Sequence, residues 1–272
     1  MALTPQSVQE PPKTAARLKI GVVMPAYNAE RTLERTFLDL PHDMISEVIL
    51  VDDGSRDRTV EVAKRLGKLP VSIFVHKQNY GYGANQKTCY TEALKKDLDV
   101  IVMVHPDYQY DPKLLPDVVA PILDGRADVV FGSRMQKRGD ALKQGMPLWK
   151  YVPNIVLTGL ENLVFGLRLS EYHTGYRAFH RRVLQSVHYH ANADSFIFDQ
   201  QIVSQIVDRR FRIAEVYVPA KYFPEASSAS FVASCIYGLN ILALLCEFIL
   251  YRLRLATPAR FLDHVDRYHR VQ

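Results

Sequence analysis

The sequence predicts an α/β protein with a Rossmann-like, mainly parallel sheet flanked by helices. Apolar runs of strand length alternate with helix-period stretches from about Leu18 to Val218, which is the pattern of repeated βαβ units. Three of the apolar runs also end directly in polar residues, at Asn28, Asp53 and Asp107. Because the carboxyl ends of parallel strands meet at one edge of a sheet, we expect these residues to share a pocket.

The elements follow in order along the chain. The predicted strands are Lys19–Met24, Glu47–Val51, Val71–Val75, Val100–Val104, Asp128–Phe131 and Arg212–Val218. Four stretches between them have helical periodicity and are predicted as helices: Glu30–Leu40, Thr59–Leu66, Ala84–Lys96 and Lys113–Leu123. The second helix is marked most clearly, since Ser55, Asp57 and Thr59 offer N-cap oxygens just ahead of it.

Length and composition fit one enzyme-sized domain with appendages. The chain has 272 residues, enough to bury a sizeable core without a second domain. Residues 1–16 are polar and contain three prolines, so we expect a loose tail. The domain itself is predicted to cover residues 17–225, and residues 226–272 are predicted to form a C-terminal helical extension.

Charge and cysteine content exclude several classes of function. The net charge is +5, which suits an anionic ligand or an anionic membrane surface but falls far short of a nucleic-acid footprint. The three cysteines form no Cys-x-x-Cys pair, so neither a disulfide framework nor a zinc site is supported. A reducing, cytoplasmic location is therefore expected.

Adjacent carboxylates, Asp52 and Asp53, follow the second predicted strand, with Gly54 allowing a turn. Carboxylates at that place can accept hydrogen bonds from a ribose hydroxyl or a base N–H. We expect both to face the pocket. For Ser55 and Asp57, by contrast, a turn with a helix cap is favoured.

A glycine-rich loop precedes the third predicted helix and contains Gly81 and Gly83. Its backbone can approach a ligand closely, and the N–H groups of the helix can face an anion. It is not the dinucleotide fingerprint, however, and an ordinary glycine-rich loop is an equal alternative.

His105, Asp107 and Gln109 alternate along the chain after the fourth predicted strand. In extended backbone this spacing puts all three on one face, where they can hold one divalent cation. Oxygen ligands suit Mg²⁺ or Mn²⁺, and an imidazole shifts the preference toward Mn²⁺ or another transition metal. The alternative for His105 is a supporting or base-stacking role.

Five segments in this order resemble the family 2 glycosyltransferases of the GT-A fold, and most closely their polyprenyl- and dolichol-phosphate sugar transferase branch. They lie between Ile20 and Pro224, and they are Val22–Asn28, Val51–Ser55, Asn79–Ala84, Gly132–Arg134 and Thr174–Phe179. In that family the first-strand loop and the acidic pair hold the nucleoside. The resemblance therefore assigns the base and ribose pocket to Pro25, Ala26, Tyr27, Asn28 and Asp53.

The family's Asp-x-Asp-x-Gln motif, which binds the metal on the donor diphosphate, falls on His105, Asp107 and Gln109. Histidine at the first position removes a negative charge, so Asp107 and Gln109 are the firmer ligands. The resemblance also implies that Arg134 and Arg177 reach toward phosphates, where a guanidinium can meet two oxygens at once.

The reaction that the resemblance implies is attack on the anomeric carbon of a nucleotide-linked sugar, with inversion. A lipid phosphate can attack unaided, whereas a glycan hydroxyl needs a base. Asp199 lies where many family members place that base or an acceptor-side acid, with Asp194 behind it. Helix capping is an equal alternative for Asp199.

Two apolar segments bear on membranes. Phe231–Tyr251 is long enough to span a bilayer but contains Asn240 and Glu247. We expect it, together with Trp149–Leu169, to lie against the membrane surface, with packing on the sheet or across a dimer as the alternative. The Gly-x-Ser-Lys sequence of the lipid-phosphate branch is replaced by Glu225–Ser230, so the acceptor stays open.

Three functions follow from these observations. The leading one is a metal-dependent glycosyltransferase that uses a nucleoside diphosphate sugar and a lipid-phosphate or glycan acceptor. A sugar nucleotidyltransferase is less favoured, because it needs a basic glycine-rich loop after the first strand, and residues 25–28 do not form one. A non-catalytic nucleotide-sugar binder is the third, if His105 disables the metal site.

Overall fold

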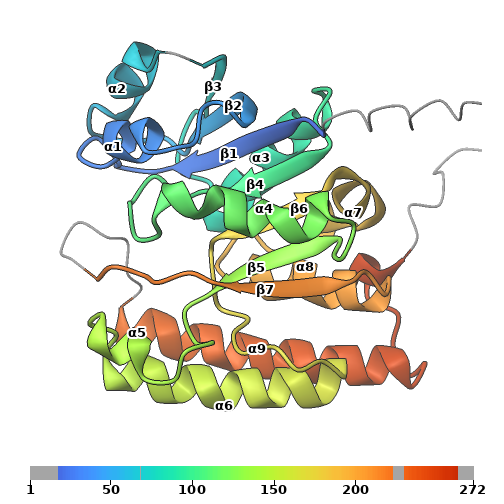
Figure 1. The fold of residues 1–272 in the computed structure, drawn as a ribbon. Coiled ribbons are helices and arrows are strands. Elements are labelled where there is room, and N and C mark those ends of the chain that lie inside the picture. The colour runs from blue at the N-terminus through green and yellow to red at the C-terminus, as the bar shows by residue number, and fades with distance from the viewer. Residues whose placement is uncertain (1–17, 68, 223–229, 263–272) are drawn as a thin grey trace, which may run out of the picture.

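A seven-stranded mixed sheet organises the computed structural model (Figure 1). The structure describes residues 18–67, 69–222 and 230–262. The predicted N-terminal tail, most of the Glu225–Ser230 segment and the last ten residues of the predicted C-terminal extension lie outside these ranges. The strands are β1 (Ile20–Ala26), β2 (Ile45–Asp52), β3 (Val71–Val75), β4 (Val100–Met103), β5 (Val129–Ser133), β6 (Arg177–His180) and β7 (Ile213–Tyr217). Their order is β3-β2-β1-β4-β6-β5-β7.

The predicted mainly parallel sheet is confirmed, with one antiparallel strand that the sequence did not reveal. β1 pairs in parallel with β2 and β4, and β5 pairs in parallel with β7. β6 runs antiparallel between β4 and β5, with Ala178 opposite both Val102 and Val130. As a result, the loop that enters β6 lies at the same sheet edge as the carboxyl ends of β4 and β5.

Helices cover both faces of this sheet. They are α1 (Leu33–Leu38), α2 (Thr59–Arg65), α3 (Tyr82–Leu94), α4 (Leu115–Leu123), α5 (Asp140–Lys143), α6 (Leu148–Phe165), α7 (Arg181–Ser186), α8 (Phe198–Asp208) and α9 (Phe231–Arg252), with single-turn helices η1 (Pro112–Leu114), η2 (Tyr189–Ala191) and η3 (Ala259–Phe261). One core cluster joins α1, α2 and α4 to one sheet face. The other joins α3, α7, α8 and α9 to the opposite face.

The two longest helices form a layer of their own. α6 and α9 pack side by side along one end of the molecule, with α8 between α9 and the sheet (Figure 1). Both were predicted as apolar helices, and α9 supplies the predicted C-terminal helical extension. Within the described residues α9 is the one helix long and apolar enough to cross a membrane, and 22% of its most apolar window is buried.

Candidate active site

One cavity of about 1660 Å³ opens at the carboxyl edge of the sheet. Asp53 after β2, Asp107 after β4 and Asp199 on α8 all line it. The cavity walls include most of the predicted site residues: Pro25, Ala26, Tyr27, Asn28, Asp53, His105, Asp107, Gln109, Arg134 and Asp199. Asp52, Gly83 and Arg177 are not among them.

Asp53 is held by three hydrogen-bond donors. Its Oδ1 accepts the Tyr80 backbone N–H at 2.9 Å, and its Oδ2 accepts the Gly81 backbone N–H at 2.9 Å. His76 Nδ1 lies 2.7 Å from the same Oδ1. Asp53 therefore fixes the glycine-rich loop beside the cavity while it lines the cavity itself.

Asp52 turns away from the cavity, contrary to its predicted pocket role. Its carboxylate accepts the Ser55 backbone N–H at 2.9 Å and the Ser55 hydroxyl at 2.5 Å. That hydroxyl oxygen in turn accepts the Asn28 backbone N–H at 2.8 Å. Adjacent residues on an extended strand face opposite ways, so Asp53 meets the cavity and Asp52 closes the turn.

The glycine at position 83 is explained by packing within the protein rather than by contact with a ligand. A Cβ on this residue would lie 2.4 Å from the Ala193 carbonyl oxygen. The Gly83 N–H donates to the Asp194 carbonyl oxygen at 2.7 Å. The glycine thus lets α3 begin against residues 193–194, and the predicted close approach to a ligand is wrong here. Asp57 accepts the Thr59 backbone N–H at 3.0 Å in the turn before α2, although the N-cap residue of that helix is Arg58.

Tyr82 joins the two chemical halves of the cavity, a role that the sequence did not indicate. Its hydroxyl donates to Asp199 Oδ2 at 2.8 Å and lies 3.3 Å from His105 Nε2. The two rings stack at an interplanar angle of 13°. Because the single hydroxyl hydrogen goes to Asp199, His105 Nε2 must be the donor to Tyr82, which leaves Nδ1 as the acceptor nitrogen. Burial lowers the pKa of His105 against the opposing charges of Asp107 and Asp199.

Asp199 is buried and receives donors on both oxygens. Besides Tyr82 on Oδ2, Gln86 Nε2 donates to Oδ1 at 3.1 Å. α8 begins at Phe198 with Ile197 as its N-cap, so Asp199 lies inside the helix and its carboxylate does not cap it. The second candidate, Asp194, pairs with Lys87 at 2.7 Å.

The residues after β4 offer a cation few protein ligands. Asp107 Oδ1 accepts the Gln109 backbone N–H at 3.0 Å. Among the described residues no group of three or more His, Cys, Asp or Glu side chains is placed to hold a metal. Mg²⁺ commonly binds through one or two carboxylates plus substrate phosphates, and Asp107 with Gln109 fits a cation that a donor diphosphate helps to hold.

Arg177 does not reach the cavity, which contradicts its predicted contact with a phosphate. It is 1% exposed, and its donors go to the carbonyl oxygens of Thr174, Tyr172 and Asp199 at 2.7, 2.8 and 3.0 Å. Its Nη1 also lies 3.7 Å from Asp199 Oδ1. The guanidinium therefore positions the start of α8 and balances the charge of Asp199.

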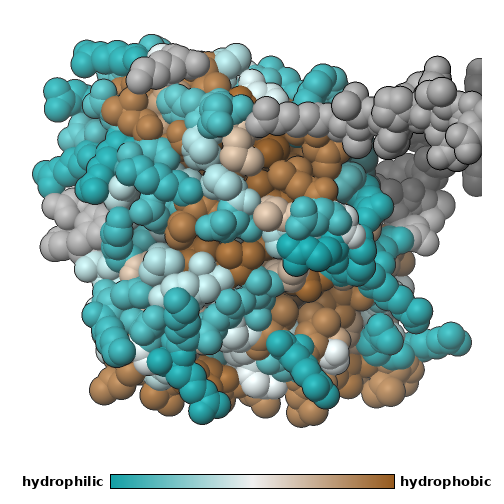
Figure 2. Space-filling model, in the orientation of Figure 1, coloured by the Kyte–Doolittle hydropathy of each residue, from teal (hydrophilic) through white to brown (hydrophobic). Residues whose placement is uncertain are grey.

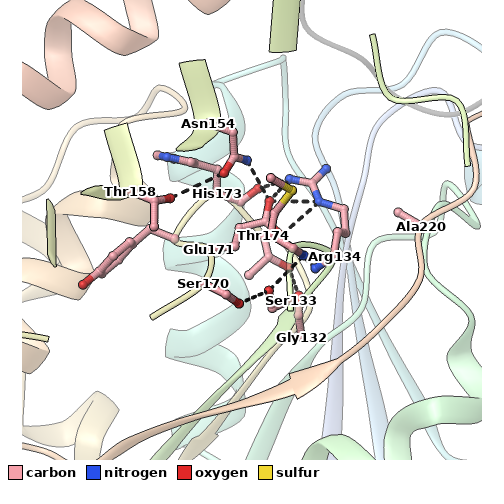
Figure 3. A network of polar contacts seen from close by, with 12 residues as sticks. Gly132, Ser133, Arg134, Asn154, Thr158, Ser170, Glu171, His173, Thr174 and Ala220 are labelled. Carbon is pink, nitrogen blue, oxygen red and sulfur yellow. Dashed lines mark hydrogen bonds and ion pairs between the residues drawn. The ribbon is translucent and has the colours of Figure 1, made fainter. Parts of the chain in front are cut away.

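Arg134 does line the cavity, but it shares its charge with a buried acid (Figure 3). Its Nε donates to Glu171 Oε1 at 2.9 Å, and Nη2 also pairs with that oxygen. A second cation, Lys150, lines the same stretch of the cavity. Burial and the nearby Arg134 lower the pKa of Lys150. Neither Glu171 nor Lys150 stands in a motif that marked it in the sequence.

Beyond Arg134 the cavity becomes apolar. Its walls there come from α6 and α9, with Trp149, Val156 and Leu157 facing Phe231 and Leu239. The polar cleft at the sheet edge and an apolar groove between two helices are thus parts of one continuous space.

Comparison with known proteins agrees with the fold. The family model described as Glycosyl transferase family 2 matches residues 21–187. Because that match covers more than half of the 272 residues, the chain belongs to glycosyltransferase family 2. The predicted family is confirmed.

Its relatives include enzymes that act on dolichyl phosphate, which supports the predicted branch. The dolichyl-phosphate hexose transferase of Haloferax volcanii is 29% identical over 74% of this chain and 82% of its own length. The UDP-N-acetylglucosamine–dolichyl-phosphate N-acetylglucosaminyltransferase of Methanococcus voltae is 28% identical over 61% of this chain and 71% of its own. The solved glucosyl-3-phosphoglycerate synthase of Mycobacterium tuberculosis shares the fold, with a TM-score of 0.63, 18% identity and coverage of 92% and 88% of the two chains.

Proposed function

We propose that this glycosyltransferase moves a sugar, with inversion, from a nucleoside diphosphate to a polyprenyl phosphate. The observation that carries the proposal is the continuity of the cavity. Its polar end contains Asp53 and Asp107, and its other end is the apolar groove between α6 and α9. A nucleotide suits the first part, and an isoprenoid chain suits the second.

The donor would lie with its nucleoside against Asp53 and its diphosphate near Asp107 and Gln109. Those two side chains would hold Mn²⁺ or Mg²⁺ together with the diphosphate, and the bound cation would offset negative charge on the leaving group. The similar fold of the mycobacterial synthase was solved with Mn²⁺ and uridine diphosphate, which supports this placement. Asp107 is therefore the residue on which donor use depends most.

The acceptor phosphate would meet the sugar beside Arg134 and Lys150, at the head of the apolar groove. One phosphate oxygen attacks the anomeric carbon, a new carbon–oxygen bond forms, and the bond to the diphosphate breaks with its electron pair. The nucleoside diphosphate leaves. A phosphate is already ionised at neutral pH, so this attack needs no general base. Asp199, whose two oxygens already accept donors from Tyr82 and Gln86, would orient the site.

The groove also indicates how a lipid would reach the site. Large apolar side chains on α6 and α9 stay exposed, among them Leu163 at 79% and Leu239 at 66%. Both helices lie on one end of the molecule (Figure 1). We propose that this end rests on the cytoplasmic face of an anionic membrane, as a peripheral contact, so that the lipid enters between the helices without leaving the bilayer.

The test is sugar transfer by the purified chain. A panel of labelled UDP- and GDP-sugars is incubated with polyprenyl phosphate and Mn²⁺, and label in the lipid extract is measured together with nucleoside diphosphate release. Transfer is expected with a subset of donors. Asp107→Asn is expected to lower it by about a hundredfold or more, whereas Asp117→Asn, at an exposed position on α4, should leave it unchanged.

Other outcomes would select another function. Pyrophosphate release would indicate a nucleotidyltransferase, and donor binding without turnover would indicate a binding protein. Transfer to glycan hydroxyls in place of lipid phosphate would overturn the acceptor assignment and give Asp199 the role of base. Unchanged transfer by Asp107→Asn would refute the metal assignment.

A further inference from the structure

We infer that Gly238 on α9 determines which acceptors the protein can use, because it leaves room for a branched hydrocarbon chain next to the phosphate. The inference rests on the proposed function, since it assumes that a polyprenyl phosphate is the acceptor. It goes further by naming the residue that admits the chain. The evidence is the place of this glycine in the cavity wall and the space beside it.

Gly238 lies inside the 22-residue helix α9, where glycine lowers helix stability relative to alanine. Packing does not require it. Apart from its own helix backbone and chain neighbours, a Cβ on Gly238 would come within 4 Å of one atom of the described residues, Leu157 Cδ1 at 3.8 Å. That is an ordinary van der Waals contact, so alanine would fit. A Cβ on Gly83, by contrast, would lie 2.4 Å from a carbonyl oxygen.

The space beside Gly238 begins next to the proposed position of the acceptor phosphate. The preceding residue, Tyr237, places its hydroxyl 3.2 Å from His173 Nδ1. The carbonyl oxygen of His173 accepts a hydrogen bond from Arg134 Nη2 at 2.7 Å. Gly238 is therefore linked through two side-chain contacts to the arginine at which the cavity changes from polar to apolar.

The opposite wall, on α6, is linked to the same arginine. Asn154 Nδ2 donates to Glu171 Oε1 at 2.9 Å, and the Glu171 carboxylate pairs with Arg134 (Figure 3). Leu157 follows Asn154 by three residues, which is about one turn of helix. Leu157 and Gly238 thus face each other across the groove just beyond Arg134.

An isoprenoid chain suits this arrangement. Its phosphate would lie beside the basic side chains Arg134 and Lys150, and its first units would extend between Leu157 and Gly238 into the apolar groove. A large side chain on both walls would close the groove at this point. The glycine keeps it open, so a larger residue at position 238 should exclude the chain and leave the donor cleft unchanged.

The first experiment measures sugar transfer by glycine variants. Gly238→Leu is expected to raise the KM for polyprenyl phosphate about tenfold or more, because its side chain takes the place of an isoprene unit. Gly238→Ala should change this KM little. Donor affinity, measured by calorimetric titration, should be equal in all variants, and thermal stability should not fall, since leucine favours helix. The control is Gly159→Leu, at an exposed position on α6 outside the cavity walls, which should transfer as wild type does.

The cysteines allow a second measurement on the unmodified protein. Cys235 is exposed and lines the cavity about one turn before Gly238, whereas Cys246 is exposed but lies outside the cavity walls. In detergent solution, polyprenyl phosphate at about ten times its dissociation constant should slow alkylation of Cys235 by a maleimide about tenfold. Alkylation of Cys246 should not change, and peptide mass spectrometry measures the two thiols separately.

Two results would overturn the inference and leave the proposed function standing, provided that the wild type transfers sugar to polyprenyl phosphate. One is an equal KM for Gly238→Leu and wild type. The other is equal protection of Cys235 and Cys246, or protection of neither. If Gly238→Leu does not fold, the two thiols decide. If the wild type transfers no sugar to polyprenyl phosphate, the proposed function fails and the inference fails with it.

Discussion

Tyr82 contacts more residues of the candidate active site than its place in the glycine-rich loop indicated. Its hydroxyl meets Asp199, its ring stacks on His105, and its other side contacts Phe196 at a centroid distance of 4.8 Å. Through this one side chain the residues after β4 and the start of α8 hold each other in place. A change at Tyr82 should therefore affect catalysis more than donor binding.

Tyr82→Phe is expected to lower the turnover number about tenfold or more while donor affinity changes little. The substitution removes a hydrogen bond to a charged group, which is worth about 1.5–3 kcal/mol, and leaves one oxygen of Asp199 without its donor. Steady-state kinetics and donor titration give the two numbers. Tyr151→Phe, at a residue outside the cavity walls, is the control. A purely structural role would lower thermal stability with turnover retained.

Glu161 on α6 is a second residue of interest, because its surroundings strongly change its pKa. It is fully buried, and a hydrogen bond from the Gln200 side chain favours its ionised form. His173 Nε2 lies 3.2 Å from its Oε2, and the charge of Arg177 favours ionisation. Burial nevertheless dominates and raises the pKa of Glu161 well above its ordinary value. Burial also lowers the pKa of His173 to about 4, so burial disfavours the charged form of both groups.

The stability of the protein should depend on pH through Glu161. The folded state keeps a proton there that the unfolded chain releases above about pH 4.5, so this contribution is present in acid and is lost as the pH rises. Glu161→Gln has no proton to lose. In urea unfolding at pH 5, 7 and 9, its free energy of unfolding relative to wild type should therefore increase with pH.

The control for that series is Glu34→Gln on α1, at an exposed carboxyl group. Its difference from wild type should stay constant with pH. Because His173 is present in both proteins, its own loss of stability between about pH 6.5 and 4 largely cancels in the comparison. A flat difference for Glu161→Gln would mean that Glu161 is ionised in the folded protein.

At the scale of elements, the described residues of α6 and α9 combine exposed apolar side chains with acidic side chains that are all buried or paired. Figure 2 shows apolar side chains along the edge where Figure 1 places α6. The acidic residues of the two helices are Glu161, which is buried, and Glu247, which pairs with Arg260. Basic residues lie in or beside both helices, at positions 150, 168, 252 and 254. This combination is typical of helices that rest on an anionic bilayer.

Binding to anionic vesicles should depend on these helices. Leu163→Glu combined with Leu239→Glu is expected to weaken binding about a hundredfold or more, because each side chain loses about 1.5–3 kcal/mol of burial in the lipid. Cosedimentation with vesicles of mixed neutral and anionic lipid measures the change. Leu38→Glu, on α1 at the opposite end of the molecule, should bind as wild type does. Equal binding by all three proteins would contradict the proposed membrane face.

Most elements were predictable because their signals are local. β3 runs over Val71–Val75 as predicted, and the other five predicted strands match within two residues at each end. β6 was missed because its four residues begin with Arg177 and end with His180, which reads as polar loop. Its antiparallel pairing on both sides makes it a strand, and no periodicity in so short a segment reveals such pairing.

The site was predictable only where the position of a residue in the sequence determines the direction of its side chain. Asp53, Asp107 and Gln109 follow strand ends and line the cavity as expected. Three other predicted residues lie in similar motifs but contact the rest of the protein instead of the cavity: Asp52, Gly83 and Arg177. Which of two neighbouring residues faces the cavity depends on the pleat of the strand and on contacts with residues far away in the sequence. A sequence motif reveals neither the pleat nor these contacts.

At the scale of the whole molecule, the cavity divides between two kinds of scaffold. Under the proposed function, the donor side is built on β1, β2 and β4, whose parallel pairing is continuous. The acceptor side would be built on α6 and α9, which pack on each other in a layer outside the sheet. The proposal thus places donor recognition on the sheet and acceptor recognition on helices added to it.

The antiparallel direction of β6 has an evolutionary consequence. The chain leaves the sheet at Ser133 and returns at Arg177, with Phe131 directly opposite Arg177 in the register. Everything between these points, α5 and α6 included, is an excursion whose two ends are neighbours, and such segments are exchanged with little disturbance to the rest of a domain. If the proposed function holds, exchange of this excursion would give the fold a different acceptor site and leave the strands that carry Asp53 and Asp107 unchanged.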